Sequence, residues 1–187
     1  QKKNKLLSDM IQNDTDKKMV QLVEAATDLS CGDICTLLEV AHSLPFVGNL
    51  EGGDTYINVL TREKESMVIA QYRHPNYDLY KRSIIGEIER REDEPAVYRA
   101  LEEGISGRGL IGIIDEGRTV VRHTVSPILN SEKKVIGALT YEYPNAGADT
   151  ESIRIINNQE GKQDPFNRQL GKASDYLQDA ILLYDAN

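Results

Sequence analysis

Apolar residues recur at helical spacing in the first third of the chain. The repeat that predicts the first helix consists of Met19, Leu22, Val23, Ala26 and Leu29. Ser30, followed three residues later by Asp33, is typical of a capping box and predicts that a second helix begins here. We expect this helix to end before Pro45, because proline removes a backbone donor and crowds the preceding turn. Residues 1–15 are polar and weakly patterned, so they are predicted to be an N-terminal extension.

A different pattern begins at Asp54, where β-branched and aromatic residues become frequent. Residues 54–60 and 67–72 predict a hairpin, since a short polar segment separates them. A long crossover follows, in which Pro95 and Gly104 mark the start and stop of a short helix. Three further strands are predicted at 107–114, 119–129 and 135–143. These elements predict an α+β fold, an antiparallel sheet of about five strands with helices packed on one face.

The last part of the chain combines a polar stretch with a heptad repeat. Residues 144–164 are predicted to be a linker or loop, and Asp164 followed by Pro165 predicts a helix start. The apolar residues then step by four and three: Phe166, Leu170, Ala173, Leu177, Ala180 and Tyr184. We therefore expect an exit helix within 165–187 that pairs with a second copy of the chain, joined in this homodimer by the N-terminal helix.

Charge and composition narrow the classes of partner. The formal net charge is −8 and no basic stripe is visible, so we expect no nucleic-acid partner. The apolar runs are too short for a bilayer and no signal peptide is visible, so we expect a cytoplasmic protein without membrane contact.

Cys31 and Cys35 are four apart on a predicted helix, a poor geometry for a disulfide. We interpret them as two small buried thiols and not as half of a metal or redox site. The chain begins with Gln1, and we expect it to be a piece of a longer protein.

Several motifs resemble a known family of sensor domains. Ser-Pro-Ile-Leu at 126–129, followed by Val-Ile-Gly-Ala-Leu at 135–139, resembles the closing strands of GAF domains. Val-Ile-Ala-Gln-Tyr-Arg-His-Pro at 68–75, together with Glu-Pro-Ala-Val at 94–97, is similar to the GAF-like N-terminal sensor domain of a group of soluble bacterial histidine kinases. The last residues, 177–187, look like the entry into a PAS domain.

The resemblance covers roughly residues 16–143 and implies an organisation for the whole protein. It implies a GAF/PAS-like sheet, with residues 16–143 as the sensor domain and 165–187 as the exit helix and the start of a PAS domain. It also implies a kinase domain downstream in the same chain, and a response regulator as its partner. In this group the response regulators often act on RNA as antiterminators, and some systems respond to ethanolamine. No cofactor is implied, and we expect no catalytic residue, since the chain has neither a nucleotide-binding loop nor a phosphoacceptor histidine.

Candidate ligand residues cluster around the crossover. Those expected to line a small-molecule pocket between the sheet and the crossover are Tyr72, His74, Tyr77 and Tyr80, with His123 and Tyr141 from the sheet. Glu87 is the candidate acceptor for an ammonium ligand. Its neighbours Glu89, Glu92, Asp93 and Glu94 could add counter-charge, although a run of charges is more often a solvated face. No metal site is expected, because no further Cys/His pair has ligand spacing.

Other functions remain open at this stage. The same fold serves as the effector domain of metabolite-responsive transcriptional regulators, so fold alone does not decide between the two classes. The domain could also persist as a dimerisation scaffold without a ligand. A GAF-type sulfoxide reductase is disfavoured, because Cys31 and Cys35 are predicted on an early helix away from the pocket.

Overall fold

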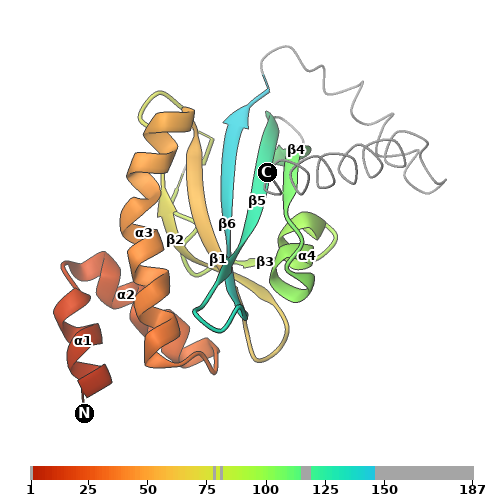
Figure 1. The fold of residues 1–187 in the computed structure, drawn as a ribbon. Coiled ribbons are helices and arrows are strands. Elements are labelled where there is room, and N and C mark those ends of the chain that lie inside the picture. Colours follow the sequence, from red (N-terminus) through yellow and green to blue (C-terminus); the bar gives the residue numbers. More distant parts are fainter. Residues whose placement is uncertain (1, 78, 81, 115–118, 146–187) are drawn as a thin grey trace, which may run out of the picture. The chain divides into compact units, whose positions relative to one another are not determined.

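The computed structural model describes residues 2–77, 79–80, 82–114 and 119–145. Its helices are α1 (Lys2–Met10), α2 (Asp14–Ala26), α3 (Cys31–Glu51) and α4 (Pro95–Glu103). Its strands are β1 (Asp54–Leu60), β2 (Ser66–Tyr72), β3 (Ile88–Glu89), β4 (Gly107–Ile114), β5 (Thr119–Leu129) and β6 (Val135–Pro144). In this part of the chain the strands form one antiparallel sheet of six strands, in the order β3-β2-β1-β6-β5-β4 (Figure 1).

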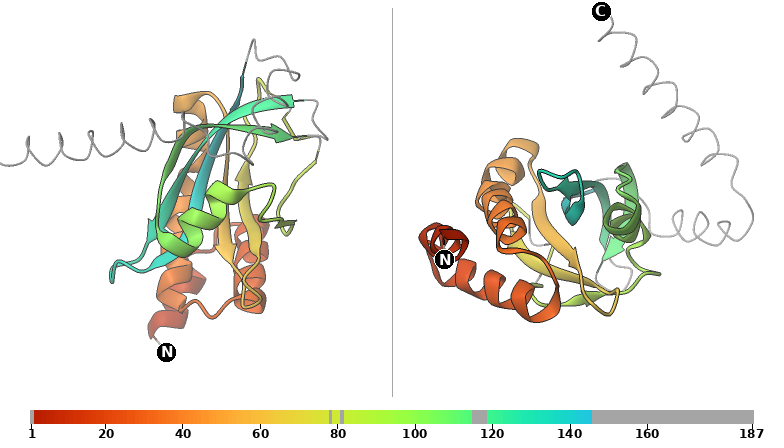
Figure 2. Two further views of the ribbon diagram at one scale, coloured as in Figure 1. Left: turned by 90° about the vertical axis from the view of Figure 1, so that its right-hand side faces the viewer. Right: turned by 60° about the horizontal axis from the view of Figure 1, so that its bottom comes forward.

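The two faces of the sheet bury different side chains. Along β1, Ile57 and Val59 point to the face covered by α1, α2 and α3, where they join the main core with Leu37. The alternate residues point the other way: Tyr56 packs with the crossover, and Leu60 packs against a second core that includes Val97 of α4. Figure 2 shows the sheet between these two helical layers.

The predicted α+β class and antiparallel sheet are confirmed, with two differences. The sheet has a sixth strand, because the two residues of β3 pair with β2 inside the crossover. Helices cover both faces and not one, since α4 lies against β1, β5 and β6 on the face opposite α3. The apolar residues Val97, Ala100 and Leu101 lie along one side of α4, and their burial there forms the second core.

Helix α3 continues through Pro45, where the sequence predicted its end. It runs to Glu51 and stops at Gly52, which adopts a left-handed conformation. Pro45 faces solvent, while Leu44 is buried against the core. Packing against the sheet therefore holds the helix beyond a residue that would end an isolated one.

Other local predictions are confirmed. Ser30 and Asp33 form the expected capping box at the start of α3. The hairpin of β1 and β2 and the bounds of α4 agree with the sequence. The segment predicted as a polar extension contains α1, whose Leu7 is 6% exposed within the main core.

The predicted linker beyond Asn145, the exit helix of 165–187 with its heptad, and the start of a PAS domain lie outside the described residues. Among the helices that the structure does describe, none has the length and apolar character needed to cross a bilayer.

Candidate functional site: a buried acidic cluster

A row of polar side chains crosses three strands on the face opposite α3. Glu142 of β6 is paired in register with Asp54 of β1 on one side and with His123 of β5 on the other. Side chains of paired residues lie on the same face of an antiparallel sheet, so the three are direct neighbours. Glu142 is fully buried and His123 is 5% exposed. The sheet thus carries an ionisable row where a core would normally be apolar.

Two phenols satisfy the Glu142 carboxylate. The Tyr56 hydroxyl donates to Oε1 at 3.0 Å, and the Tyr80 hydroxyl donates to Oε2 at 2.6 Å. The two rings meet edge to face, with centroids 6.4 Å apart. Burial and the negative charge of Glu142 raise the pKa of both phenols above the ordinary tyrosine value, so both remain donors at neutral pH.

The crossover brings two more carboxyl groups to the same place. Glu89 of β3 accepts hydrogen bonds from Asn58 Nδ2 at 2.7 Å and from Ser66 Oγ at 3.4 Å. Glu94 is the residue that precedes α4, and its Oε2 lies 3.7 Å from His123 Nδ1. We call Glu89, Glu94 and Glu142, together with Tyr56, Tyr80 and His123, the acidic cluster.

The carboxyl groups of the cluster repel one another. Burial, and then the charge of Glu142, raises the pKa of Glu94 to about 9 and that of Glu89 to about 7. The charged groups that act on the Glu94 carboxyl are Glu142, Glu89 and Asp93, all of them acidic. The cluster therefore has the electrostatic character of a site that attracts positive charge.

Several polar atoms in and beside the cluster are buried without a hydrogen-bond partner. They are Glu94 Oε2, His123 Nδ1, Asp54 Oδ2, Asn58 Oδ1 and Thr140 Oγ1. Buried polar atoms in folded proteins are nearly always paired, and each exception points to an unfilled role such as an ion or a ligand. Both Glu94 Oε2 and His123 Nδ1 belong to the same contact.

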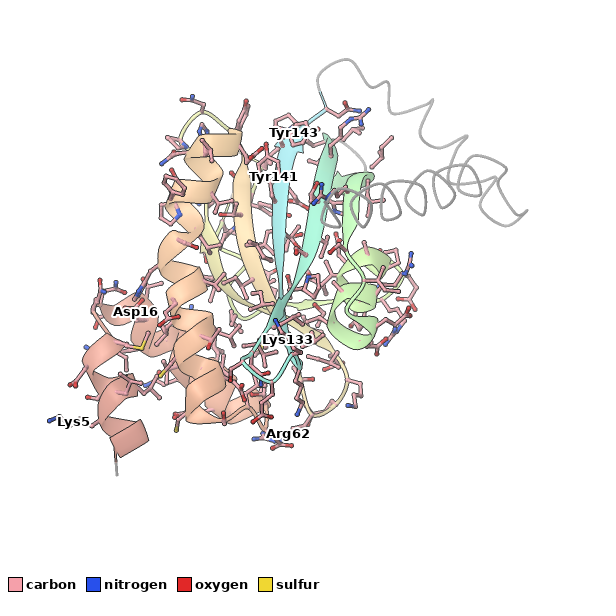
Figure 3. The ribbon with its side chains drawn as sticks, in the orientation of Figure 1. Lys5, Asp16, Arg62, Lys133, Tyr141 and Tyr143 are labelled. Atoms are coloured by element: carbon pink, nitrogen blue, oxygen red, sulfur yellow. The ribbon has the colours of Figure 1, made fainter. Side chains whose placement is uncertain are left out.

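The structure brings two of the predicted site residues into this cluster, Tyr80 and His123. Tyr141, the other sheet residue expected to line the pocket, does not join His123 there, because the register pairs Tyr141 with Thr124 and Glu142 with His123. A shift of one residue moves a side chain to the other face of a sheet. The Tyr141 hydroxyl instead donates to the carbonyl of Glu51 at the end of α3, and its ring stacks on Tyr143 (Figure 3).

The other predicted residues lie around the start of the crossover and outside the cluster. The Tyr72 hydroxyl donates to Asn49 Oδ1 of α3 at 2.8 Å, and Glu87 forms an ion pair with Arg82. His74 is buried, with its backbone N–H donating to Asp54 Oδ1, and its ring packs on Tyr77 with centroids 5.2 Å apart. Residues 73–77 line an open surface hollow of about 450 Å³. Glu94 Oε2 and His123 Nδ1, which are buried without a partner and face each other, lie in the cluster, so the cluster is the stronger candidate.

Sequence reasoning missed Tyr56 and Glu142 and placed Glu89 and Glu94 only in a charge run. One signal for Glu142 was present: it is an acidic residue inside the apolar strand pattern of β6. The partners of Glu142 carried no signal, because Tyr56 is 86 positions away in the chain and Tyr80 is 62.

Solved structures similar to this chain include the following three, of which the first supports the fold. The sensor region of a sensor histidine kinase has a TM-score of 0.53 at 17% identity, over 70% of this chain and 43% of that chain. The chain thus spans less than half the length of that structure. A phycocyanobilin-bound GAF domain from a cyanobacterial phytochrome has a TM-score of 0.39 at 12% identity, over 82% of this chain and 100% of that chain. A putative transcriptional regulator, RHA06195 from Rhodococcus sp. RHA1, has a TM-score of 0.44 at 14% identity, over 68% of this chain and 63% of that chain.

A search of curated proteins found no match. A family model described as the GAF domain of histidine kinase PdtaS matches residues 19–160, which is most of the chain. The resemblance to GAF-like sensor domains of histidine kinases is therefore confirmed. This chain belongs to the family of GAF domains typified by histidine kinase PdtaS.

Proposed function

We propose that this GAF domain is the sensory input of a cytoplasmic histidine kinase and that the acidic cluster binds a small, positively charged ligand. The observation that carries the proposal is the burial of Glu142 beside Glu89 and Glu94, whose charged neighbours are acidic. Buried charges are normally paired with opposite charge or coordinate a metal. A cation supplied from outside would complete the cluster in the same way.

Ligand binding in this cluster would join two parts of the domain. Glu142 and His123 stand on the sheet, whereas Glu89 and Glu94 belong to the crossover that leads into α4. Without a cation, the crossover lies close to the sheet only while Glu94 keeps a proton, in line with its raised pKa, because ionised carboxylates repel one another. With a cation the same carboxylates are attracted to a common point, so the crossover and α4 become ordered against β5 and β6. A ligand with this preference shifts the population between the two states.

The route onward is proposed from the sequence. We propose that residues 165–187 form an exit helix that pairs in a homodimer through its heptad repeat and leads into PAS and kinase modules, with a response regulator as the partner of that kinase. The dimer is tested by light scattering of the Leu170→Glu plus Leu177→Glu double variant. We expect a shift toward the monomer, and an unchanged mass would contradict this arrangement.

The ligand class is tested by thermal shift of the 187-residue chain after dialysis against a chelator. The probes are primary amines including ethanolamine, quaternary amines, divalent metal ions and, as the opposite charge, small carboxylates. We expect at least one cation to raise the melting temperature, because a ligand at 100 times its Kd stabilises the folded state by about 2.7 kcal/mol. Glu142→Gln should abolish this shift.

Two matched variants control for the loss of a negative charge. Glu132→Gln changes an exposed residue between β5 and β6, and Glu87→Gln changes the ion pair with Arg82. Both should keep the response of the wild type. Stabilisation by carboxylates alone, or a full cation response in Glu142→Gln, would contradict the proposed function.

A further inference from the structure

We infer that the cation of the acidic cluster is a divalent transition-metal ion, coordinated by Glu94 Oε2, His123 Nδ1 and Glu142 Oε1. The inference rests on the proposed function in one respect, namely that the cluster takes a cation. It adds the class of that cation and the three atoms that hold it.

The three donor atoms lie close to coordinating separations. His123 Nδ1 is 3.7 Å from Glu94 Oε2 and 3.7 Å from Glu142 Oε1, and the three donor positions all lie within 4.8 Å of one another. Metal–ligand bonds to imidazole and carboxylate are roughly 2.0–2.2 Å, so two ligands of one ion are about 3–4 Å apart. An ion fits among these atoms after a small inward movement.

An independent observation points to a ligand at this position. The His123 side chain is almost fully buried, with 6% of it exposed, yet its Nδ1 has no hydrogen-bond partner. Glu94 Oε2, which it faces, is also buried and unpartnered. A ring nitrogen and a carboxylate oxygen left unpaired in contact with each other are both satisfied by one shared metal ion.

The surroundings of the three donors favour coordination. Glu142 Oε1 accepts one hydrogen bond, from Tyr56, and a carboxylate oxygen has a second lone pair for a metal. Tyr80 fixes the other oxygen, and hydrogen bonds of this kind orient ligating carboxylates. Glu94 stands at the N-cap of α4 but makes no capping hydrogen bond with its side chain, so its carboxylate remains available.

The donor set indicates the kind of metal. One imidazole with two carboxylates suits Zn²⁺, Mn²⁺ or Fe²⁺, whereas Ca²⁺ and Mg²⁺ prefer oxygen ligands alone. Three protein ligands leave at least one position for water, as in sites that exchange a ligand. Because the donors come from the N-cap of α4, from β5 and from β6, one ion would tie α4 to the sheet.

The test uses the 187-residue chain after removal of metals by a chelator. Equilibrium dialysis with Zn²⁺ should give one tightly bound ion per chain, and Mg²⁺ should not compete for it. His123→Ala and Glu94→Gln should each weaken binding by at least about 100-fold, more than the loss of an outer-shell partner typically produces. His42→Gln is the matched control, because His42 pairs with Asp16 on the other side of the sheet and should bind as the wild type does.

Co²⁺ provides a second readout that does not depend on affinity. Its visible spectrum should show coordination by nitrogen and oxygen, without the intense near-ultraviolet band of a thiolate, which separates this site from binding by Cys31 and Cys35. Far-ultraviolet circular dichroism checks that each variant is folded. If His123→Ala does not fold, Glu94→Gln carries the comparison, since Glu94 is partly exposed and makes no cap hydrogen bond.

Three outcomes overturn the inference: no bound metal, metal retained in both variants, or a thiolate band that accounts for the bound Co²⁺. If metal is absent but an amine stabilises the chain in a Glu142-dependent way, the inference fails and the proposed function stands. If the metal binds as described but a histidine kinase carrying this domain keeps the same autophosphorylation rate, the metal site stands and the sensory role fails.

Discussion

The buried carboxyl groups make the stability of the domain depend on pH. The groups that face Glu94 from the sheet and the crossover are Glu142, Glu89, His123 and Asp93. In the folded chain the pKa of Glu94 is about 9 and that of Glu89 about 7, against 4.5 for an ordinary glutamate. At pH values between 4.5 and these raised pKa values, the folded state keeps protons that the unfolded state has lost. A rise in pH therefore favours unfolding.

We therefore predict that the metal-free chain loses stability as the pH rises from 5 to about 9. Each unit by which the pKa differs between the folded and unfolded states corresponds to about 1.4 kcal/mol, so the free energy of unfolding should fall by more than about 1 kcal/mol over this pH range. Glu94→Gln should flatten the slope, because the amide does not titrate, and Glu132→Gln should leave it unchanged. The measurement is the free energy of unfolding in urea at each pH. A slope shared by Glu94→Gln and the wild type would contradict this origin.

Gly53 allows β1 to approach β6 beside the acidic cluster. A Cβ atom at this position would lie 2.1 Å from the carbonyl oxygen of Glu142 and 2.6 Å from the ring of Tyr141. Gly53→Ala should therefore force the two strands apart and cost about 1–3 kcal/mol. Gly32→Ala is the control, since its nearest neighbour would be Ser30 Oγ at 3.7 Å and alanine favours the helix. Chemical denaturation compares the two, and equal stabilities would exclude a backbone clash.

The acidic cluster could be predicted from the sequence only in part. The crossover was identified as a pocket wall, and two of the residues predicted there or on the sheet, Tyr80 and His123, belong to the cluster. Among the acids of the crossover, pairing of β3 with β2 places Glu89 beside Ser66, and the start of α4 places Glu94. Sequence spacing does not encode that pairing. The metal donors Glu94, His123 and Glu142 likewise come from three elements and form no local motif.

Helix α2 ends against an arginine from the hairpin. The backbone N–H of Arg62 donates to the Ala26 carbonyl at 2.9 Å, and its guanidinium donates to the Ala25 and Thr27 carbonyls and pairs with Asp28. These are the carbonyls that a helix leaves unpaired at its C-terminus, where a cation is also favoured by the helix dipole. Arg62, at the opposite end of the sheet from Tyr141 in Figure 3, therefore holds α2 to the β1–β2 turn.

Arg62→Met should lower the free energy of unfolding by about 1–2 kcal/mol, because several carbonyls lose a charged donor. Arg62→Lys should recover less than half of this loss, since one ammonium group cannot reproduce the planar fork of donors. Arg108→Met, at an exposed position of β4, serves as the control for removing a positive charge. Thermal unfolding of the three variants is sufficient, and full recovery by lysine would show that charge alone matters.

At the scale of helices and strands, local signals predicted boundaries where the signal and its partner lie close in the chain. The capping box of Ser30 and Asp33 is such a case, and so is α4 between Pro95 and Gly104. The predicted end of α3 was wrong because the helix packs against the rest of the domain on both sides of Pro45, at Leu44 and at Gly48. The position of α4 on the second face also depended on long-range packing against Val125 and Ala138.

Considered as a whole, the chain offers a direct connection from the cluster to whatever follows the domain. Glu142 stands two positions before Pro144, where β6 ends, and the chain then enters the predicted linker of residues 144–164, which leads to the predicted exit helix. A cation that draws Glu94 and Glu142 together acts on the final strand itself. A tenfold change in the population ratio of two conformational states requires only about 1.4 kcal/mol of difference in binding free energy for the ligand between them.

We predict that Glu142→Gln uncouples the output of a histidine kinase carrying this domain from the cation. The amide removes the repulsion that the cation would relieve and cannot bind the cation in its place, so the autophosphorylation rate should be the same with and without cation. That rate should lie near the value of the cation-bound wild type, because both lack the repulsion between the crossover and β6. The rate is measured with labelled ATP for wild type, Glu142→Gln and Glu132→Gln, of which the last should respond as the wild type does. A response of normal size in Glu142→Gln would show that the signal does not pass through this carboxylate.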